Sequence, residues 1–317
     1  MPELPEVETI VRGLQRVLPG RGIISIQLGK TDFIADPASL EQRLPGCQIA
    51  KVSRHGKFIV VKMLRRSEGA KNTMGFSQKP LLLVHLGMTG RLTVNPVAAP
   101  IPPHTHARLL LDNGRELRYT DIRRFGSIRV IPENESDKYL GPLGADPLDI
   151  GEIGFRDLIS TRDARIKGLL LDQRVLRGMG NIYTDESLWR ARIHPARLGS
   201  SLKLEECARL FRAAQKILRE AIRLGGSSIS DYVDAEGEPG EFQIRHRVYQ
   251  REGKKCFRCG SLIRRIIVAG RSSYFCPQCQ RAPRQIGIRR RRTRIHNHIV
   301  CGHEFSSAAP KVASPRS

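Results

Sequence analysis

Residues 256–279 read CFRCGSLIRRIIVAGRSSYFCPQC, and the four cysteines of this stretch determine how it folds. Two Cys-x2-Cys pairs are separated by sixteen residues, a spacing typical of a structural site in which four thiolates bind one zinc ion. Apolar runs between the pairs flank Ala269-Gly270-Arg271 and predict a hairpin. The alternative, four incidental buried thiols, is disfavoured by this spacing. The predicted ligands of one structural zinc ion per chain are Cys256, Cys259, Cys276 and Cys279.

The predicted zinc module is rich in basic residues. A zinc ribbon alone does not define a function, because ribbons of this kind serve many unrelated proteins. A hairpin with an arginine at its tip, here Arg271, can reach a DNA groove or a phosphate. The basic residues of the module are Lys254, Lys255, Arg258, Arg264, Arg265, Arg271 and Arg281.

The whole chain is strongly basic. Its 317 residues carry a formal net charge of +23, with a pI near 10.5. Residues 285–317 contain seven Lys or Arg and one Glu, so the remaining residues still carry +17. Such a charge on a folded body indicates a polyanionic partner, most often nucleic acid, although a ribosomal or merely basic protein would share it.

Nothing in the sequence predicts a membrane segment or an export signal. No run of eighteen apolar residues occurs, and the first twenty residues contain acids and several polar residues. We therefore expect a soluble, cytoplasmic protein without a membrane partner. The chain has seven cysteines, an odd number with four of them clustered, which favours metal binding over a disulfide framework.

The first half of the chain reads as one helix followed by strands. The apolar residues from Leu4 to Leu18 recur at helical spacing, and Pro5 is tolerated in a first turn. Short β-branched runs follow between residues 23 and 131, and Asp112-Asn113-Gly114 is typical of a hairpin turn. This pattern predicts an antiparallel β-sandwich or barrel.

The second half has a different pattern. Residues 132–151 are rich in Pro, Gly and acids and predict a linker. The helical periodicity that follows is clearest over residues 202–223, with Gly225-Gly226 as the stop signal. The basic end, residues 283–317, predicts a disordered tail.

Six separated segments resemble one family, the formamidopyrimidine-DNA glycosylases. They occur in the family's order over residues 2–282, and together they are highly specific. The resemblance implies a multidomain α+β fold with an N-terminal β-sandwich and flanking helices, a helix–two-turn–helix domain and a C-terminal four-cysteine zinc hairpin. The segments are PELPEVET (2–9), RHGK (54–57), HLGMTG (85–90), YTDIRRFG (119–126), GNIY with ESL (180–188), and the zinc module.

The same resemblance implies an activity and a domain plan. The activity is removal of oxidised purines, such as 8-oxoguanine and formamidopyrimidines, from damaged double-stranded DNA, followed by strand cleavage through β,δ-elimination. A monomer is implied. The predicted domains are the catalytic β-sandwich (1–131), the linker (132–151), the helix–two-turn–helix domain (152–240), the zinc finger (241–282) and the tail (283–317).

The resemblance assigns the nucleophile to Pro2. Removal of Met1, which a small second residue favours, would expose a secondary amine. The ordinary pKa of an α-amino group, about 7.7–8.0, leaves a useful neutral fraction near neutral pH. Such an amine can attack C1′ of the damaged nucleotide, expel the base and form an iminium, which acidifies the C2′ proton for elimination. An activated water would stop at the abasic sugar.

Three charged residues are assigned to proton transfer by the same resemblance. Glu3 is implied to assist opening of the sugar ring as a proton donor, for which it needs a raised pKa. Lys57 and Arg271 match residues assigned to the first and the second elimination. Taken singly, simpler interpretations stay open, namely a helix-dipole carboxylate for Glu3 and solvated surface charges for the other two.

Six further residues are expected to contact DNA. Met88, Arg123 and Phe125 match residues that enter the base stack when the damaged base is flipped out. Met88 suits a flexible apolar filler, Arg123 a cation for the orphaned base, and Phe125 a ring that wedges a base step. Core packing remains the alternative for Met88 and Phe125. Asn181 is expected to cap a helix whose backbone amides hold a phosphate. His104 matches a DNA-contacting histidine. Asp163 stands where the family usually has a basic DNA contact, and its neighbour Arg162 is expected to make that contact.

Two other functions stay open. The connection at residues 65–79 is long, and residues 227–231 resemble the loop that covers a flipped base, so the lesion preference is undecided. An endonuclease VIII-like glycosylase for oxidised pyrimidines would share Pro2, Glu3 and the zinc hairpin, but LPEVET and RRF favour the purine type. A non-catalytic zinc-ribbon DNA-binding protein is disfavoured by the intact Pro2, Glu3 and Lys57.

Overall fold

The computed structural model describes residues 2–65, 79–228 and 232–282. The predicted basic tail and the central parts of the loops at 65–79 and 227–231 lie outside the described residues. No helix in the described ranges is both long enough and apolar enough to cross a lipid bilayer.

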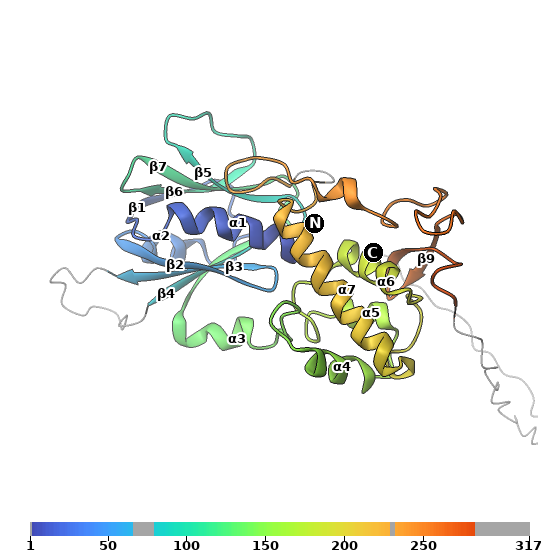
Figure 1. The fold of residues 1–317 in the computed structure, drawn as a ribbon. Helices are drawn as coiled ribbons and strands as arrows, with labels where there is room; N and C mark the ends of the chain where they lie inside the picture. The colour runs from blue at the N-terminus through green and yellow to red at the C-terminus, as the bar shows by residue number, and fades with distance from the viewer. Residues whose placement is uncertain (1, 66–78, 229–231, 283–317) are drawn as a thin grey trace, which may run out of the picture. The chain divides into compact units, whose positions relative to one another are not determined.

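The chain begins with helix α1, Leu4–Val17 (Figure 1). The carboxylate of Glu6 accepts a hydrogen bond of 2.8 Å from the backbone nitrogen of Glu3, which satisfies a free donor at the helix start. Pro5 stands in the first turn, where a missing N–H costs nothing. The apolar positions from Leu4 to Leu18 are buried, so the predicted helical stripe is confirmed.

Two four-stranded antiparallel sheets form the first half of the chain. Their strand orders are β1-β6-β7-β5 and β2-β3-β4-β8, and α1 lies between them (Figure 1). Val7, Ile10 and Leu14 of α1 join the inward side chains of both sheets in one core, so the predicted sandwich is confirmed. The strands are β1 Ile23–Leu28, β2 Cys47–His55, β3 Phe58–Arg65, β4 Pro80–His85, β5 Gly90–Pro96, β6 Thr105–Leu111, β7 Arg115–Asp121 and β8 Ser127–Pro132.

The predicted hairpin at residues 112–114 joins β6 to β7, which pair antiparallel. Gly114 has φ +71°, a backbone conformation that a residue without Cβ adopts without strain. Helix α2, Pro37–Arg43, begins at Asp36, whose side chain accepts a hydrogen bond of 3.0 Å from the backbone nitrogen of Ser39.

The segment predicted as a linker is structured in part. It contains a 3₁₀ turn, Glu133–Glu135, and helix α3, Ser136–Leu140. Further along, Asp146 is buried and accepts a hydrogen bond of 2.7 Å from Arg54 Nη1 on β2. A Pro- and Gly-rich composition does not reveal such anchoring, because the partner lies 92 residues away in sequence.

Helices α4 to α7 form a second core in the rest of the chain. The longest, α7, ends at Arg223, and Gly225 then adopts φ +71°, so the predicted helix and its stop signal are confirmed. The buried side of α7 packs on α6 and α4. The helices are α4 Glu152–Ser160, α5 Ile166–Leu171, α6 Asn181–Ala191 and α7 Leu204–Arg223, with 3₁₀ turns at Gly199–Ser201 and Phe242–Arg245.

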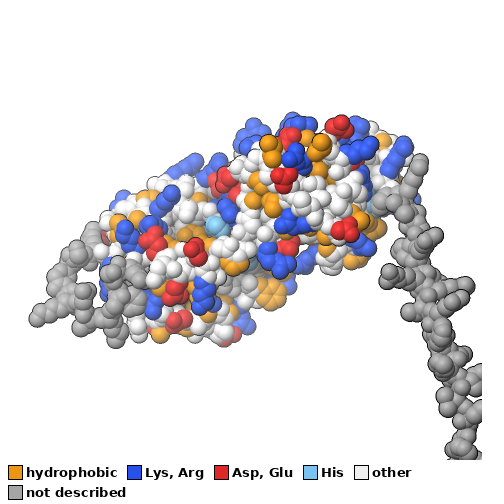
Figure 2. Space-filling view, turned by 90° about the horizontal axis from the view of Figure 1, so that it is seen from below, with side chains coloured by type: hydrophobic (Ala, Val, Ile, Leu, Met, Phe, Trp, Pro, Cys, Tyr) orange, Lys and Arg blue, Asp and Glu red, His pale blue; other side chains and the backbone are white. Residues whose placement is uncertain are grey.

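A two-stranded antiparallel hairpin follows, formed by β9, Arg264–Val268, and β10, Arg271–Phe275. Ala269 and Gly270 at its tip both have positive φ, +49° and +70°, as a tight two-residue hairpin turn requires. The predicted hairpin between the cysteine pairs is therefore confirmed. Lys and Arg side chains are spread across the face of the molecule in Figure 2, with Asp and Glu between them.

Candidate active site and zinc centre

Three predicted segments meet at one end of the strands in the sheet β2-β3-β4-β8. Lys57 lies in the turn between β2 and β3. Its neighbour Phe58 pairs with His85 at the end of β4, and His85 also pairs with Ser127 at the start of β8. Antiparallel pairing therefore brings the Lys57 turn, the loop after His85 and the loop before Ser127 to the same end of the sheet.

Glu3 lies against the N-terminus of α6. Its Oε1 accepts a hydrogen bond of 3.0 Å from the backbone nitrogen of Ile182, and its Oε2 one of 3.4 Å from that of Tyr183. A helix N-terminus favours a carboxylate because its free N–H groups and dipole are positive. A Cβ at Gly180 would lie 2.2 Å from Cδ of Glu3, so this arrangement requires glycine at position 180.

The expected role of Asn181 needs correction. Asn181 is the first residue of α6, and Gly180 occupies the capping position. The backbone amides of Ile182 and Tyr183, in the first turn of α6, donate to Glu3. The side chain of Asn181 turns to the zinc hairpin, where Nδ2 donates a hydrogen bond of 3.0 Å to the carbonyl of Ser272. The sequence could not reveal that a carboxylate 179 residues away binds the backbone amides at the N-terminus of this helix.

Burial changes the protonation of the charged groups here. It raises the pKa of Glu3, although Lys57 and the amide donors of α6 oppose the shift. It lowers the pKa of Lys57, with Glu3 and Glu6 opposing and Arg271 adding to the decrease. Lys57 thus lies within electrostatic range of both Glu3 and Arg271, and Pro2 is buried beside Glu3.

Glu6 connects the chain start to two distant segments. Its carboxylate accepts hydrogen bonds from the hydroxyl of Tyr183 and, at 2.7 Å, from the backbone nitrogen of Ser227. Burial, together with the negative charge of Glu3, raises the pKa of Glu6 to about 7. Ser227 begins the loop that the sequence assigned to covering a flipped base, so Glu6 ties that loop to the Glu3 turn.

The hairpin that bears Arg271 is fastened to the helical half by a buried ion pair. Lys167 Nζ on α5 lies 2.7 Å from a carboxylate oxygen of Asp185 on α6 and donates a hydrogen bond of 2.6 Å to the carbonyl of Ser272. The other oxygen of Asp185 accepts one of 2.9 Å from the backbone nitrogen of Tyr274. Arg271, itself exposed, therefore stands at the start of a strand that is anchored to α5 and α6 at two residues, Ser272 and Tyr274.

Asp121 holds the two loops predicted to enter the base stack. This fully buried carboxylate accepts hydrogen bonds of 2.6 Å from the hydroxyl of Thr89 and 2.8 Å from the backbone nitrogen of Gly126. The loops also touch directly, since a Cβ at Gly87 would lie 2.4 Å from the nitrogen of Gly126. The loops that carry Met88 and Phe125 are therefore held together by one buried carboxylate.

The core-packing alternative for Met88 and Phe125 is excluded by their exposure. The exposed fractions are 37% for Met88 and 59% for Phe125. The Arg123 guanidinium lies over the Phe125 ring, 4.7 Å from its centroid, a cation–π arrangement. Large apolar side chains held out of the core by a buried support are typical of a binding surface.

The two remaining predicted contacts lie elsewhere. His104 is exposed with φ +62°, and its carbonyl accepts a hydrogen bond of 3.0 Å from the backbone nitrogen of Asp121. Arg162 lies just after α4 and donates a hydrogen bond of 2.6 Å to the carbonyl of Leu158 in the last turn of that helix. Asp163 accepts a hydrogen bond of 2.9 Å from Ser200.

The four cysteines of the zinc module form one cluster. Their Sγ atoms all lie within 4.8 Å of one another. A tetrahedral zinc ion with bonds of about 2.3 Å would place the sulfurs about 3.8 Å apart, so the cluster fits this metal. Backbone nitrogens of Arg258 and Cys279 point at the sulfurs of Cys256 and Cys276, at 3.5 and 3.4 Å, and would stabilise thiolates. The cysteines form no disulfides.

Three family models match the chain. They are described as the formamidopyrimidine-DNA glycosylase N-terminal domain, over residues 1–128, the formamidopyrimidine-DNA glycosylase H2TH domain, over residues 143–233, and a zinc finger found in FPG and IleRS, over residues 253–282. The chain belongs to the formamidopyrimidine-DNA glycosylase family.

Curated glycosylases of this family are similar over nearly their whole length. A formamidopyrimidine-DNA glycosylase of Solibacter usitatus (strain Ellin6076) is 45% identical over 283 residues, which cover 89% of this chain and 100% of the relative. One from Pelotomaculum thermopropionicum (strain DSM 13744 / JCM 10971 / SI) is 42% identical over 289 residues, covering 89% and 99%.

Solved structures of the glycosylase family have the same fold. A mutant Lactococcus lactis FPG in complex with a Fapy-dG-containing DNA matches with a TM-score of 0.79 at 34% identity, covering 89% of this chain and 100% of that one. MutM in complex with carbocyclic 8-oxo-G-containing DNA matches with a TM-score of 0.78 at 34% identity and the same coverage. The predicted family and fold class are thereby confirmed.

Sequence reasoning missed several residues that organise this glycosylase-family site. Asp121 and Tyr183 lay inside recognised motifs without an assigned task, and the Lys167–Asp185 pair was not singled out. One signal was available: Lys167 stands between Ile166 and Gly168, which three leucines follow, in a helix that is otherwise without charge, and a cation at such a position needs a buried partner. The identity of that partner could not be read from the sequence.

Proposed function

We propose that this chain is a bifunctional DNA glycosylase and abasic-site lyase that removes oxidised purines, such as 8-oxoguanine and formamidopyrimidines, from damaged duplex DNA. The observation that carries the proposal is the buried carboxylate of Glu3, whose pKa is raised directly beside Pro2. The names of the relatives and the lesion-containing DNA in the matched structures support the substrate class.

The proposed nucleophile is the secondary amine of Pro2 after removal of Met1. Its nitrogen forms a bond to C1′ of the damaged nucleotide as the bond from C1′ to the base breaks. The electron pair of the broken bond leaves with the base, which then takes up a proton. Opening of the sugar ring then yields an iminium. Loss of a C2′ proton expels the 3′ phosphate, a second elimination expels the 5′ phosphate, and water finally hydrolyses the iminium and releases Pro2.

Glu3 is the proposed proton donor to the ring oxygen. A raised pKa increases the share of this carboxyl group that carries a proton, and its place next to Pro2 in the chain supports the role of donor to the attacked sugar. Lys57 and Arg271 are proposed to bind the two phosphates that leave. Lowering of the pKa of Lys57 by burial makes this ammonium a better proton donor during the first elimination.

Flipping of the damaged base is assigned to the exposed loops that Asp121 supports. Phe125 would wedge the base step, Met88 would fill the vacated space, and Arg123 would contact the orphaned base. His104, Asn181 and Arg162 are proposed to contact the DNA backbone. Displacement of a base costs a few kcal/mol, which exposed apolar side chains can offset by stacking.

The zinc centre is proposed to be structural, with one zinc ion per chain held by Cys256, Cys259, Cys276 and Cys279. Four thiolates complete a tetrahedral zinc site, so the ion would stabilise the hairpin of Arg271 without taking part in the chemistry. A monomer acting in the cytoplasm fits the role of a repair enzyme.

Borohydride trapping with an 8-oxoguanine duplex tests the proposal. We expect a covalent protein–DNA adduct with the wild-type chain and a much weaker one with Pro2→Gly at equal DNA binding, because base release and strand scission both slow in that variant. A chain that binds the duplex but gives no adduct would be a binding protein without the chemistry. Preferential trapping on a thymine glycol duplex would instead support the pyrimidine-specific glycosylase. That enzyme stays the second candidate because the loop at 227–231 leaves the lesion preference undecided.

A further inference from the structure

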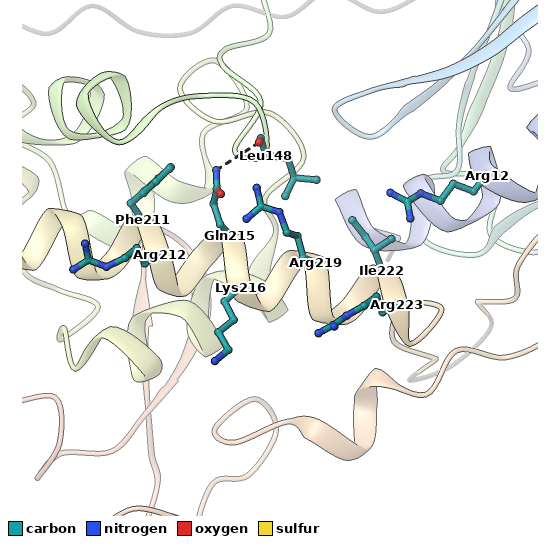
Figure 3. Close-up of a pocket in the computed structure, with 9 residues that line it drawn as sticks. All are labelled: Arg12, Leu148, Phe211, Arg212, Gln215, Lys216, Arg219, Ile222 and Arg223. Atoms are coloured by element: carbon teal, nitrogen blue, oxygen red, sulfur yellow. Dashed lines mark hydrogen bonds between the residues drawn. The ribbon is translucent and has the colours of Figure 1, made fainter.

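A basic groove lies beside helix α7 (Figure 3). It is bounded by the exposed stripe of α7, by Leu148 and by Arg12 of α1, and it measures about 610 Å³. No acidic residue lines it, and its apolar lining is Leu148, Phe211 and Ile222. Its five cationic residues are Arg12, Arg212, Lys216, Arg219 and Arg223.

Three of these cations lack a protein partner. Lys216, Arg219 and Arg223 are exposed, and none of them forms an ion pair or a side-chain hydrogen bond with another residue in the described ranges. They are spaced at i, i+3 and i+7 along α7, and in Figure 3 Arg219 extends from the upper side of the helix while Lys216 and Arg223 extend from its lower side. Like charges three or four residues apart on a helix repel one another, so an anion in the groove would relieve that repulsion.

The acids near the groove are engaged elsewhere or at its ends. Glu220 of α7 lies 3.4 Å from Arg190, on α6. Arg12 lies 2.9 Å from Glu8, which also binds Arg54. Arg212 lies 3.5 Å from Glu152 of α4. The middle of the groove therefore keeps its positive charge.

The groove is separate from the site assigned to base excision. Glu6 on α1 faces the buried cluster with Tyr183 and Ser227. Arg12 follows six positions later, about 240° further round the helix, and so faces another direction. None of the four residues to which we assign chemistry lines the groove.

We propose that this groove binds the phosphate backbone of a DNA segment outside the excision site. The kind of polyanion rests on the proposed function. Lys216 and Arg223 are separated by about 10.5 Å along the helix axis. This length matches about three base-pair steps of 3.4 Å, so the stripe can follow one strand. Guanidinium groups bind phosphate oxygens with two parallel hydrogen bonds, and two of the three free cations are arginines.

The DNA segment can come from two sources, the flank of the duplex already held at the excision site or a second duplex. Both present the same phosphates. The structure assigns the groove to that shared chemistry, and the lengths of the DNA probes separate the sources.

The test compares Lys216→Ala/Arg219→Ala with the wild-type chain. Alanine preserves helix propensity, so the fold should survive. The control is Lys51→Ala/Lys138→Ala, which removes two exposed cations that neither line the groove nor belong to the proposed excision site. Affinity is measured against salt concentration for an undamaged duplex of about 40 base pairs and for a lesion duplex of about 12 base pairs, whose axis spans only about 40 Å.

We expect the groove variant to bind the long duplex about tenfold more weakly at low salt, with a salt slope reduced by about 2. The control should stay within about twofold of wild type, and single-turnover excision on the short duplex should be unchanged. A loss that appears when a lesion duplex of about 40 base pairs replaces the short lesion duplex identifies the flank. A loss only when undamaged duplex is added to the short complex identifies a second duplex.

Three results would overturn the proposal: no loss in the groove variant, an equal loss in the control, or an equal loss on the short duplex. A loss of binding to poly-glutamate without any loss of DNA binding would mark a surface for acidic proteins and also refute it. The undamaged duplex keeps this test independent of catalysis. If no borohydride adduct forms but the groove variant still loses affinity for DNA, the proposed function is refuted and the proposal for the groove stands.

Discussion

Lys167 and Asp185 form an ion pair of 2.7 Å in which the side chains are 0% and 1% exposed. The pair joins α5 to α6 and, through Ser272 and Tyr274, to the hairpin that bears Arg271. Two charges without water contact must satisfy each other, because an unpaired charge at this depth is costly. The pair therefore makes the position of the zinc hairpin depend on the helical core.

Lys167→Met should destabilise the protein strongly. It leaves the buried Asp185 without its cation, and loss of one partner of a buried pair costs about 3–5 kcal/mol. Urea unfolding followed by circular dichroism measures the change. The matched control is Arg174→Met, which breaks the exposed pair with Asp172 and should cost less than about 1 kcal/mol. Equal effects of the two variants would contradict the structural role of the buried pair.

Gly180→Ala should abolish most of the base-excision activity while the fold persists. Its Cβ would overlap the Glu3 side chain, whose Cδ lies at 2.2 Å, and would push the carboxylate away from the N-terminus of α6. Loss of a positioned general acid lowers the rate about 10²–10⁴-fold. Single-turnover excision of 8-oxoguanine measures the rate.

Gly151→Ala is the control for that change, because Gly151 also precedes a helix and an added Cβ there meets nothing within 4 Å. It should leave the excision rate unchanged. A Gly180→Ala enzyme as fast as this control would show that the carboxylate of Glu3 does not need its place at α6.

The stability of the protein should depend on Glu6 through pH. Burial raises the pKa of Glu6 to about 7 from an ordinary value near 4.3. The folded protein thus binds this proton more tightly than the unfolded chain does. The resulting stabilisation is complete below about pH 4.3 and is lost as the pH rises through 7, on the order of 3 kcal/mol.

Glu6→Gln removes that titration, so the unfolding free energy of wild type should fall relative to the variant between about pH 5 and pH 8. Urea unfolding at several pH values gives the difference. Glu205→Gln, an exposed glutamate in the first turn of α7, should show no such trend. Parallel pH curves for wild type and Glu6→Gln would contradict the raised pKa.

Phe125→Ala should weaken lesion binding without loss of stability. The side chain is 59% exposed, and substitutions at exposed positions usually change stability by less than about 0.5 kcal/mol. Loss of a stacking ring costs about 1–3 kcal/mol of binding to a displaced base step. Leu204→Ala, at 66% exposure on α7, should leave both quantities unchanged. A large drop in melting temperature for Phe125→Ala would return this residue to a packing role.

Removal of zinc should alter the emission of Trp189, the one tryptophan of the chain. Trp189 packs in a cluster with Cys256 and Cys276, and the Arg258 guanidinium lies 4.3 Å from its ring centroid. Loss of the metal should open this cluster and shift the emission to the red. Metal analysis should find one zinc ion per chain in Cys207→Ala and less in Cys256→Ala. Full zinc content in Cys256→Ala would contradict the four-cysteine site.

Sequence patterns were sufficient wherever the cause is local. The helical stripe from Leu4 to Leu18, the hairpin turn at residues 112–114 and the stop at Gly225 all follow from spacing or from one residue's backbone freedom, and the structure has each of them. The cysteine spacing predicted a cluster that the structure contains. Local rules fail for the segment 132–151, where anchoring by Arg54 is not a local property.

The sequence by itself determined the family motifs, an antiparallel β-sandwich or barrel, the long helix and the four-cysteine cluster, because periodicity and spacing act within a few residues. Only the tertiary structure decided that Glu3 occupies the end of α6, that Asp121 joins two loops and that Lys167 finds Asp185. A buried polar group takes whichever partner the folded chain brings within about 3 Å, and separation along the sequence does not predict that partner.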